Sequence, residues 1–320
     1  MNKNEDPLYI ETEEEFRERC LSNAGITYSA AAILPVLLSF VFSFIVVMAC
    51  GSFGTSFIES KNYPDWYIYC IYLLPQLAFL GAAAIYFFRT REPIKVVCPR
   101  CKPRYFLIAL LLQFGLLFSL SDLNTFFIMF LESLGYRSSG LSMPNLSGWN
   151  LLPAILVIAL VPAVMEEVLF RGILSRNMNA NGWGLACTVV ISGAMFSLFH
   201  GNPEQTVYQF LCGMCFTLIA LRSGSILPTM CAHFLNNALI LILTSCGVGD
   251  LWQLGWGYLA IFVISLVCLV GTLVYLIFFD KNNSQKGGVK AGKVFFVAAA
   301  VGIVICAAEW VYALVTGFYA

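Results

Sequence analysis

Two adjacent glutamates lie inside a strongly apolar stretch of this chain. Glu166 and Glu167 belong to the run LLPAILVIALVPAVMEEVLFRGIL, which begins at Leu151. Carboxylates at membrane depth are costly, and they mark functional sites by default. Arg171 follows Glu167 by four residues, the favoured order for an ion pair within one helix. Because neighbouring helical residues point about 100° apart, Glu166 has no partner on its own helix and is the first candidate for chemistry.

Both histidines of the chain follow these glutamates, each within a pair of helical spacing. Phe196 and His200 are four residues apart, and so are His233 and Asn237, so each pair shares one helix face. The simplest interpretation of each pair is a hydrogen bond between helices, which contributes about 1 kcal/mol or less in a membrane. A glutamate, two histidines and an amide in neighbouring apolar stretches instead favour one shared polar site.

The types of these side chains are suited to hydrolysis of an acyl bond. Glu166, removed from bulk water, can act as a general base on a water molecule that His200 orients. His233 and Asn237 can donate hydrogen bonds to the oxyanion of a tetrahedral intermediate. The sequence contains no GxSxG nucleophile elbow. The pattern therefore predicts hydrolysis of an acyl group by activated water, without a cofactor.

A zinc-dependent reaction is the alternative. Two histidines and a glutamate form a known catalytic zinc ligand set, which here would be His200, His233 and Glu166. However, the HExxH helix pattern is absent. The general base would then have to be Glu167, which the ion pair with Arg171 occupies. We therefore favour the metal-free mechanism and keep zinc as the alternative.

The composition places these residues in a membrane. Of the 320 residues 59% are hydrophobic and 11% are charged, with a mean hydropathy of +0.81, whereas soluble domains have about 25% charged residues. The net charge of zero and the lack of a basic arm argue against a nucleic-acid partner. A short apolar patch at 123–131 predicts an interfacial or re-entrant helix. Nine stretches approach the ~20 residues that a transmembrane helix needs: 29–50, 66–88, 105–121, 151–175, 184–200, 206–222, 226–246, 255–279 and 294–316.

The positions of lysine and arginine give these spans a topology. With a cytoplasmic N-terminus and nine spans, the inner segments hold sixteen cations and the outer segments two, as the positive-inside rule expects. We therefore predict an all-α, polytopic integral membrane bundle of about nine spans, with eight as the alternative. Its predicted parts are an acidic cytosolic tail (1–28), N-terminal transmembrane helices with one interfacial helix (29–150), a catalytic core (151–246) and C-terminal transmembrane helices (247–320).

Three motifs in consecutive spans resemble a known family: Glu166-Glu167-x-x-x-Arg171, Phe196-x-x-x-His200 and His233-x-x-x-Asn237. Together they look like the CPBP family of intramembrane proteases, which includes CAAX prenyl proteases and bacteriocin-processing enzymes and is also called Abi or Rce1-like. The resemblance covers about 151–246. It implies a helical membrane endopeptidase with Glu166 and His200 activating water and His233 and Asn237 forming the oxyanion site. Such proteases have been described both as metalloproteases and as metal-independent glutamic proteases, so the resemblance leaves the metal open.

The predicted function is cleavage of a membrane-associated peptide, either a prenylated protein or a leader peptide, by a multi-pass enzyme of a bacterial plasma membrane. The leading alternative is a catalytically silent relative, such as an immunity or peptide-binding protein, which would keep the same polar cluster. A transporter is a third class. The sequence shows no internal repeat of the kind that many transporters have, which argues against it.

The predicted helix ends create one conflict in depth. If the helix that carries Glu166 ends at Asn177, Glu166 lies roughly 16 Å from the inner end of that helix. His200 would lie about 24 Å from Gly184 on the same rise per residue. Straight helices that start at one level would therefore place His200 too deep, unless a helix is tilted or the fourth span is longer than predicted.

Overall fold

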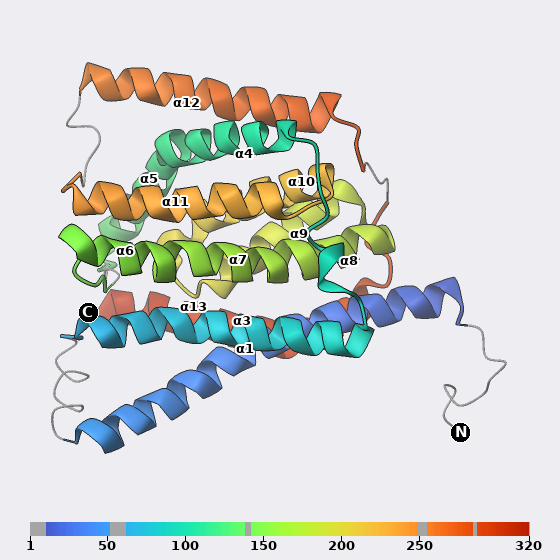
Figure 1. The fold of residues 1–320 in the computed structure, drawn as a ribbon, viewed down its shortest axis with the longest axis horizontal. Coiled ribbons are helices and arrows are strands. Elements are labelled where there is room, and N and C mark those ends of the chain that lie inside the picture. Colours follow the sequence, from blue (N-terminus) through green and yellow to red (C-terminus); the bar gives the residue numbers. More distant parts are fainter. Residues whose placement is uncertain (1–10, 52–61, 138–141, 249–254, 284–286, 320) are drawn as a thin grey trace.

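The computed structural model describes residues 11–51, 62–137, 142–248, 255–283 and 287–319. These residues form a bundle of helices and no strand, which confirms the predicted all-α class (Figure 1). The helices are α1 (Glu13–Cys50), α3 (Asp65–Thr90), α4 (Arg104–Gly115), α5 (Ser121–Ser133), α6 (Leu151–Ala154), α7 (Val161–Glu167), α8 (Arg176–Met178), α9 (Gly184–Phe199), α10 (Thr206–Ser223), α11 (Leu227–Ser245), α12 (Trp256–Val274) and α13 (Gly292–Tyr319). Wider π-helical turns join α4 to α5 and α6 to α7 to α8, and follow α8 and α12.

Eight helices within the described ranges are long and apolar enough to cross a membrane. One of them, Gly148–Phe199, has 52 residues, which is about 78 Å of helix against a hydrocarbon core of about 30 Å. Its backbone leaves the helical conformation at Asn181 and Gly182, where Gly182 has a φ of 98°. The chain folds back there, and Ser175 Oγ lies 2.9 Å from Ser192 Oγ. This hairpin has two arms, so the eight helices correspond to nine helical segments within the described ranges, and the nine membrane passes stay a prediction.

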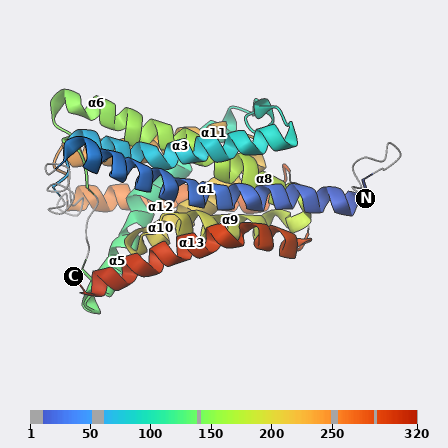
Figure 2. The same ribbon diagram turned by 90° about the horizontal axis from the view of Figure 1, so that it is seen from below.

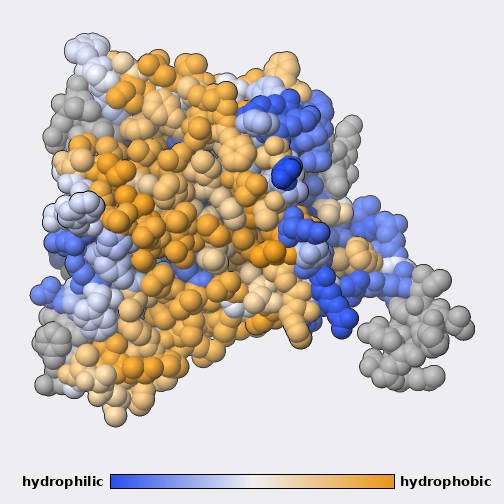
Figure 3. All heavy atoms as spheres, viewed as in Figure 1, coloured by the Kyte–Doolittle hydropathy of each residue, from blue (hydrophilic) through white to orange (hydrophobic). Residues whose placement is uncertain are grey.

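The two ends of the bundle differ in character. The start of α1 and the end of α13 lie at opposite ends (Figure 2), as an odd number of passes requires. On the face that Figure 3 shows, a broad hydrophobic band covers the middle, and the strongly hydrophilic residues gather mainly at the end where α1 starts. This arrangement fits a membrane-spanning bundle. A cytoplasmic location of the α1 end remains a prediction from the lysine and arginine count.

We expect that an impermeant thiol reagent will not label Cys98 or Cys101 in intact cells, because the loop between α3 and α4 is predicted to face the cytoplasm. Both thiols are partly exposed, so a permeable reagent should reach them. Cys246 is exposed directly after α11, at the predicted outer end, and serves as the positive control. The measurement uses single-cysteine variants, and labelling of Cys98 without labelling of Cys246 would reverse the topology.

Two segments differ from their predicted form. The patch at 123–131 is not a separate re-entrant helix, because α5 continues α4 through a π-helical turn without leaving the helical conformation. A helix can absorb one wide turn where an extra residue lies in the chain. In addition, α1 begins at Glu13, so residues 13–28 of the predicted tail are helical. Within them, Leu21, Ala24 and Tyr28 are buried in the bundle.

The hairpin removes the conflict in depth. Because the helix that carries Glu166 continues past Asn177 to Ala180, Glu166 lies roughly 21 Å from the turn. His200 lies about 24 Å from the same turn along α9, so the two side chains reach a similar level. The fourth span is thus longer than predicted, and straight, antiparallel helices suffice.

Small residues bring α10 against this hairpin. Gly193 on α9 and Gly213 on α10 face each other, and a Cβ added to Gly213 would lie only 2.9 Å from the Cα of Gly193. Close backbone contact at small residues is a common way in which membrane helices associate. The contact also brings the carbonyl oxygen of Gly213 to 3.3 Å from Arg171 Nη2. Helix packing and the polar site therefore depend on the same pair of glycines.

Candidate active site

The four side chains predicted to do chemistry lie around one small cavity. Glu166, His200, His233 and Asn237 all line a space of about 60 Å³, which is enough for a few water molecules. Glu166 comes from α7, His200 follows the end of α9, and the other two come from α11. The cavity also has Phe196, Gln209, Cys212, Phe216 and Asn236 in its wall. The structure thus brings together side chains that are up to 71 residues apart.

A buried ion pair underlies this cavity. Glu167 Oε1 accepts a hydrogen bond from Arg171 Nη1 at 2.8 Å, and neither side chain is exposed. This is the pairing expected from their spacing. The same oxygen lies 2.9 Å from His233 Nδ1, a contact that their spacing does not predict. Glu167 therefore links the arginine to one of the histidines of the cavity.

Aromatic rings enclose the guanidinium group of Arg171. Its central carbon lies 4.3 Å from the centre of the Phe196 ring, 5.4 Å from that of Phe216 and 6.0 Å from that of Phe170. A cation over an aromatic face is attracted by the ring quadrupole, more strongly when it is desolvated. Phe196, which was predicted to share a helix face with His200, thus contacts Arg171. Its ring also lies 4.8 Å from that of His200.

Glu166 has two polar neighbours on other helices. Gln76 on α3 donates a hydrogen bond from Nε2 to Glu166 Oε1 at 3.3 Å. His233 Nε2 lies 3.8 Å from Glu166 Oε2, which is too long for a hydrogen bond but short enough for one water molecule to contact both atoms. The polar side chain of Gln76 at membrane depth was a signal, but nothing in its own segment identified the partner.

The hydrogen bonds of the two histidines determine which ring nitrogen faces the cavity. His200 Nδ1 lies 2.9 Å from the carbonyl oxygen of Phe196. Because a carbonyl can only accept, Nδ1 carries the proton, and Nε2 is the free acceptor of a neutral ring. His233 Nδ1 similarly donates to the carboxylate of Glu167. Both Nε2 atoms are therefore the nitrogens available for chemistry.

An amide network orients Asn237. Its Oδ1 accepts from Asn236 Nδ2 at 3.0 Å, and its Nδ2 donates to the carbonyl of Ile158 at a longer 3.3 Å. Asn236 is itself held through Oδ1, which accepts from Gln113 Nε2 at 2.6 Å and from the Tyr208 hydroxyl at 2.8 Å. With its oxygen held in this way, Asn237 keeps one N–H for a ligand. Asn236 and Gln113 thus orient Asn237, although neither belongs to the three motifs.

The fit of a zinc ion depends on the donor types of these side chains and on how they are placed. The donor types are suitable, and each histidine donates its Nδ1–H to an oxygen acceptor, which is common among zinc ligands. However, no group of three or more His, Cys, Asp or Glu side chains in the described ranges is placed to hold a metal ion. We therefore derive no chemical step through a metal.

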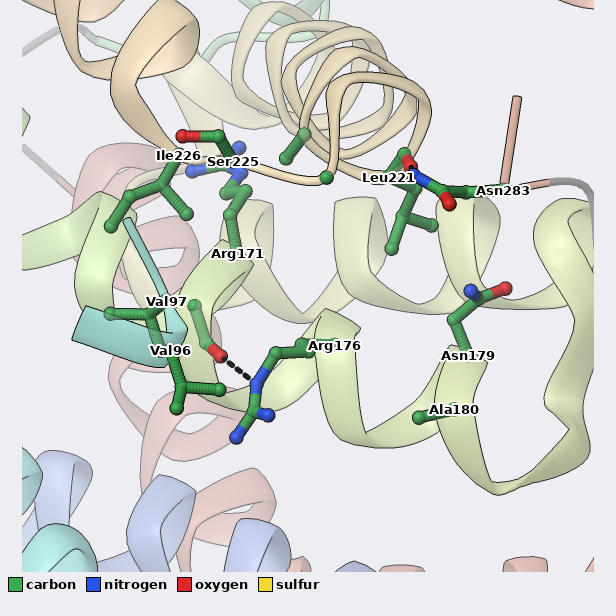
Figure 4. Close-up of a pocket in the computed structure, with 13 residues that line it drawn as sticks. Val96, Val97, Arg171, Arg176, Asn179, Ala180, Leu221, Ser225, Ile226 and Asn283 are labelled. Carbon is green, nitrogen blue, oxygen red and sulfur yellow. Dashed lines mark hydrogen bonds between the residues drawn. The ribbon is translucent and has the colours of Figure 1, made fainter. Parts of the chain in front are cut away.

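A second cavity, of about 250 Å³, is lined in part by Arg171 and lies near the turn between α10 and α11 (Figure 4). Arg176 extends along it and donates from Nε to the carbonyl of Gly172 at 3.0 Å. Arg176 is also paired with Glu92. None of the four candidate catalytic side chains lines this cavity.

The fold and site together define a polytopic membrane protein with a Glu, His, His, Asn constellation around one small cavity. Residues 148–239 match the family described as type II CAAX prenyl endopeptidase Rce1-like. The chain therefore carries an Rce1-like domain, as the three motifs predicted, and this is consistent with the CPBP group of CAAX proteases. The matched region contains both glutamates, both histidines and Asn237. No curated protein and no solved structure matches the chain.

Proposed function

We propose that this chain is an intramembrane endopeptidase in which Glu166 activates a water molecule for attack on a peptide bond. The observation that carries the proposal is the meeting of Glu166, His200, His233 and Asn237 at one water-sized cavity inside an Rce1-like domain. That family is a protease family. The direct test is cleavage of prenylated CAAX peptides and of leader peptides by the purified protein in liposomes.

The reaction follows from the available acceptors. Water in the cavity donates hydrogen bonds to the Glu166 carboxylate and to His200 Nε2, the free acceptor of that ring. Glu166 takes a proton as the water oxygen forms a bond to the carbonyl carbon. The same proton then passes to the leaving nitrogen as the C–N bond breaks. A carboxylic acid and an amine are the products, and Glu166 returns to its ionised form.

The oxyanion of the tetrahedral intermediate needs donors on the other side of the cavity. Asn237 supplies the N–H that its amide network leaves free. His233 can donate from Nε2 only when both of its nitrogens carry protons. In that form Nδ1–H faces Glu167 and Nε2–H faces the cavity and Glu166. Glu167 and Arg171 thus act as positioning residues for His233 and do not touch the substrate.

The substrate class we propose is a membrane-associated peptide, either a prenylated C-terminal sequence or a leader peptide, cut in a bacterial plasma membrane. A catalytically silent peptide-binding protein is the alternative because it would keep the same cavity. The two differ in one measurement, since only the protease releases a peptide fragment. Peptide binding without any fragment would favour the silent relative.

Asn237→Ala is expected to lower kcat by on the order of 10²–10³, the usual loss for one oxyanion donor. The position of cleavage and the KM should change little, because the substrate in its ground state does not carry the oxyanion. The measurement is steady-state cleavage with mass analysis of the products. Asn145→Ala, in the loop before α6, is the control that should leave kcat unchanged. An unchanged kcat in Asn237→Ala would remove this residue from the oxyanion site.

Activity is expected to survive strong chelators, and the purified protein should lack stoichiometric zinc, because the proposed base and donors are all side chains. Metal analysis and cleavage after chelation are the measurements. One set of results would replace this mechanism by the zinc-dependent one. In that case a chelator inactivates the enzyme, added zinc restores the activity, and the metal content falls in both His200→Ala and His233→Ala.

A further inference from the structure

Glu166 and His200 also line a larger cavity, of about 420 Å³. Its walls come from α1, α3, α9 and α13 in addition to the helix that carries Glu166, and they are largely apolar, as at Tyr72, Phe79 and Phe199. Because the proposed water-activating residues line both cavities, a chain in the larger cavity would lie beside the water in the smaller one. The larger cavity therefore has the position and the size of a substrate site.

Glu309 on α13 is the second carboxylate in this cavity, and no lysine or arginine lines it. No hydrogen bond or ion pair to Glu309 is found within the described parts of the chain. An unpaired carboxylate at membrane depth is costly and marks a functional position. Glu309 also lies outside the matched domain, so the motifs give it no role. A ligand that supplies a positive charge would remove the cost.

Glu309 lies at the level of the reacting groups. Trp183 Nε1 donates to the carbonyl of Lys290 at 2.8 Å, which holds the starts of α9 and α13 together. From those starts His200 and Glu309 are about 24 Å and about 26 Å along their helices. A Cβ added to Gly201, the residue after His200, would lie 3.6 Å from Glu309 Oε2. The Glu309 carboxylate therefore lies near the backbone next to His200, although Glu309 as a whole is exposed.

The same cavity offers acceptors for peptide N–H groups. Gln76 uses its Nε2 to hold Glu166, while its buried Oε1 has no partner. Pro75, inside α3, has no N–H, so the carbonyl of Ile71 loses its helical partner. Ile71, Pro75 and Gln76 all line the cavity. A chain that binds there in an extended form needs the carbonyl of Ile71 as its acceptor. To use Gln76 Oε1 as well, the Gln76 side chain has to turn, because that atom is fully buried.

We propose that the larger cavity binds the substrate chain and that Glu309 selects substrates with a lysine or arginine side chain within a residue or two of the scissile bond. The assignment rests on the proposed peptidase function, but it concerns recognition and can be measured without turnover. Glu309 is a specificity-determining residue in this arrangement, and Gln76 is a positioning residue for Glu166.

The test measures binding of dansylated Leu/Ala nonapeptides to the full-length Glu166→Gln protein in liposomes. One peptide series carries a single lysine moved along the sequence, and its twin series carries norleucine at the same positions. We expect the best lysine peptide to bind about tenfold more tightly than its twin, the size of a charge-assisted interaction. When Glu309→Gln is added, the lysine peptide should bind no more tightly than its norleucine twin. When Glu309→Lys is added instead, a third peptide series that carries aspartate should bind most tightly. Glu132→Gln, an exposed change on α5, should keep it.

The outcomes separate recognition from catalysis. No preference for lysine, or a preference that persists in Glu309→Gln, overturns the role of Glu309. Cleavage of both series by the wild-type protein at equal kcat/KM would also overturn it, while the peptidase proposal would stand. A lysine preference that depends on Glu309, with no fragment released by the wild-type protein, would support the recognition site and reject the peptidase.

Discussion

Glu166→Gln should abolish measurable cleavage, lowering kcat by on the order of 10⁴, the upper range for loss of a general base. Glutamine keeps the shape of the side chain and one oxygen that can accept from Gln76 Nε2, now 3.3 Å from Glu166 Oε1. It cannot take the proton of the water. Binding of a peptide should persist because the walls of both cavities are unchanged. Single-turnover cleavage and peptide binding in liposomes are the two measurements.

Two further variants test whether the loss of cleavage is due to the carboxylate at position 166. Glu132→Gln makes the same chemical change on the exposed surface of α5, and it should leave kcat unaltered. Glu166→Asp keeps a carboxylate but withdraws it by one methylene, so it should retain part of the activity. An active Glu166→Gln enzyme that also resists chelators would rule out both the glutamate-based and the zinc-based mechanism. The peptide-binding protein would then be the better account.

Arg171→Met should destabilise the protein by about 3–5 kcal/mol, because removing one partner of a buried ion pair leaves the other charge uncompensated. Glu167 and Arg171 are both fully buried. Activity should fall as well, since Glu167 also holds His233 Nδ1 at 2.9 Å. Thermal unfolding in a mild detergent gives the stability, and cleavage per folded protein gives the activity.

The chain contains a matched pair for comparison. Glu13 and Arg17 on α1 have the same four-residue spacing and a similar 3.0 Å contact, but the Glu13 side chain is 90% exposed. Arg17→Met should therefore cost less than about 1 kcal/mol. The double variant Glu167→Gln/Arg171→Met should recover at least half of the stability that Arg171→Met loses. Equal losses from Arg171→Met and Arg17→Met would show that burial does not govern the strength of this pair.

The sequence was sufficient for the class of fold and for the family. A transmembrane helix needs a long apolar stretch because its backbone must be hydrogen-bonded within itself in lipid, so the spans are visible as composition. The ion pair of Glu167 with Arg171 was equally accessible, because both residues lie on one helix at a fixed spacing. The break around Gly182 was predicted as the connection between two spans, whereas the extension of the fourth span to Ala180 was not.

The motifs also predicted which polar side chains form the site, because a polar side chain in hydrocarbon is costly unless it has a partner or a function. Their catalytic roles remain predictions. What the motifs could not supply was the partner of each group. Gln76 reaches Glu166 from α3, and Glu309 reaches the same cavity from α13; both lie outside the matched region.

Only the tertiary structure decided these partners, because contacts between helices depend on how each helix is rotated and how far it extends. The hydrogen bond from His233 Nδ1 to Glu167 joins residues on two helices. The network that orients Asn237 acts through Asn236, its neighbour on the same helix. No periodicity in a single segment specifies such contacts. Spacing along the chain therefore determined which groups lie at membrane depth, whereas packing determined which of them meet at Glu166.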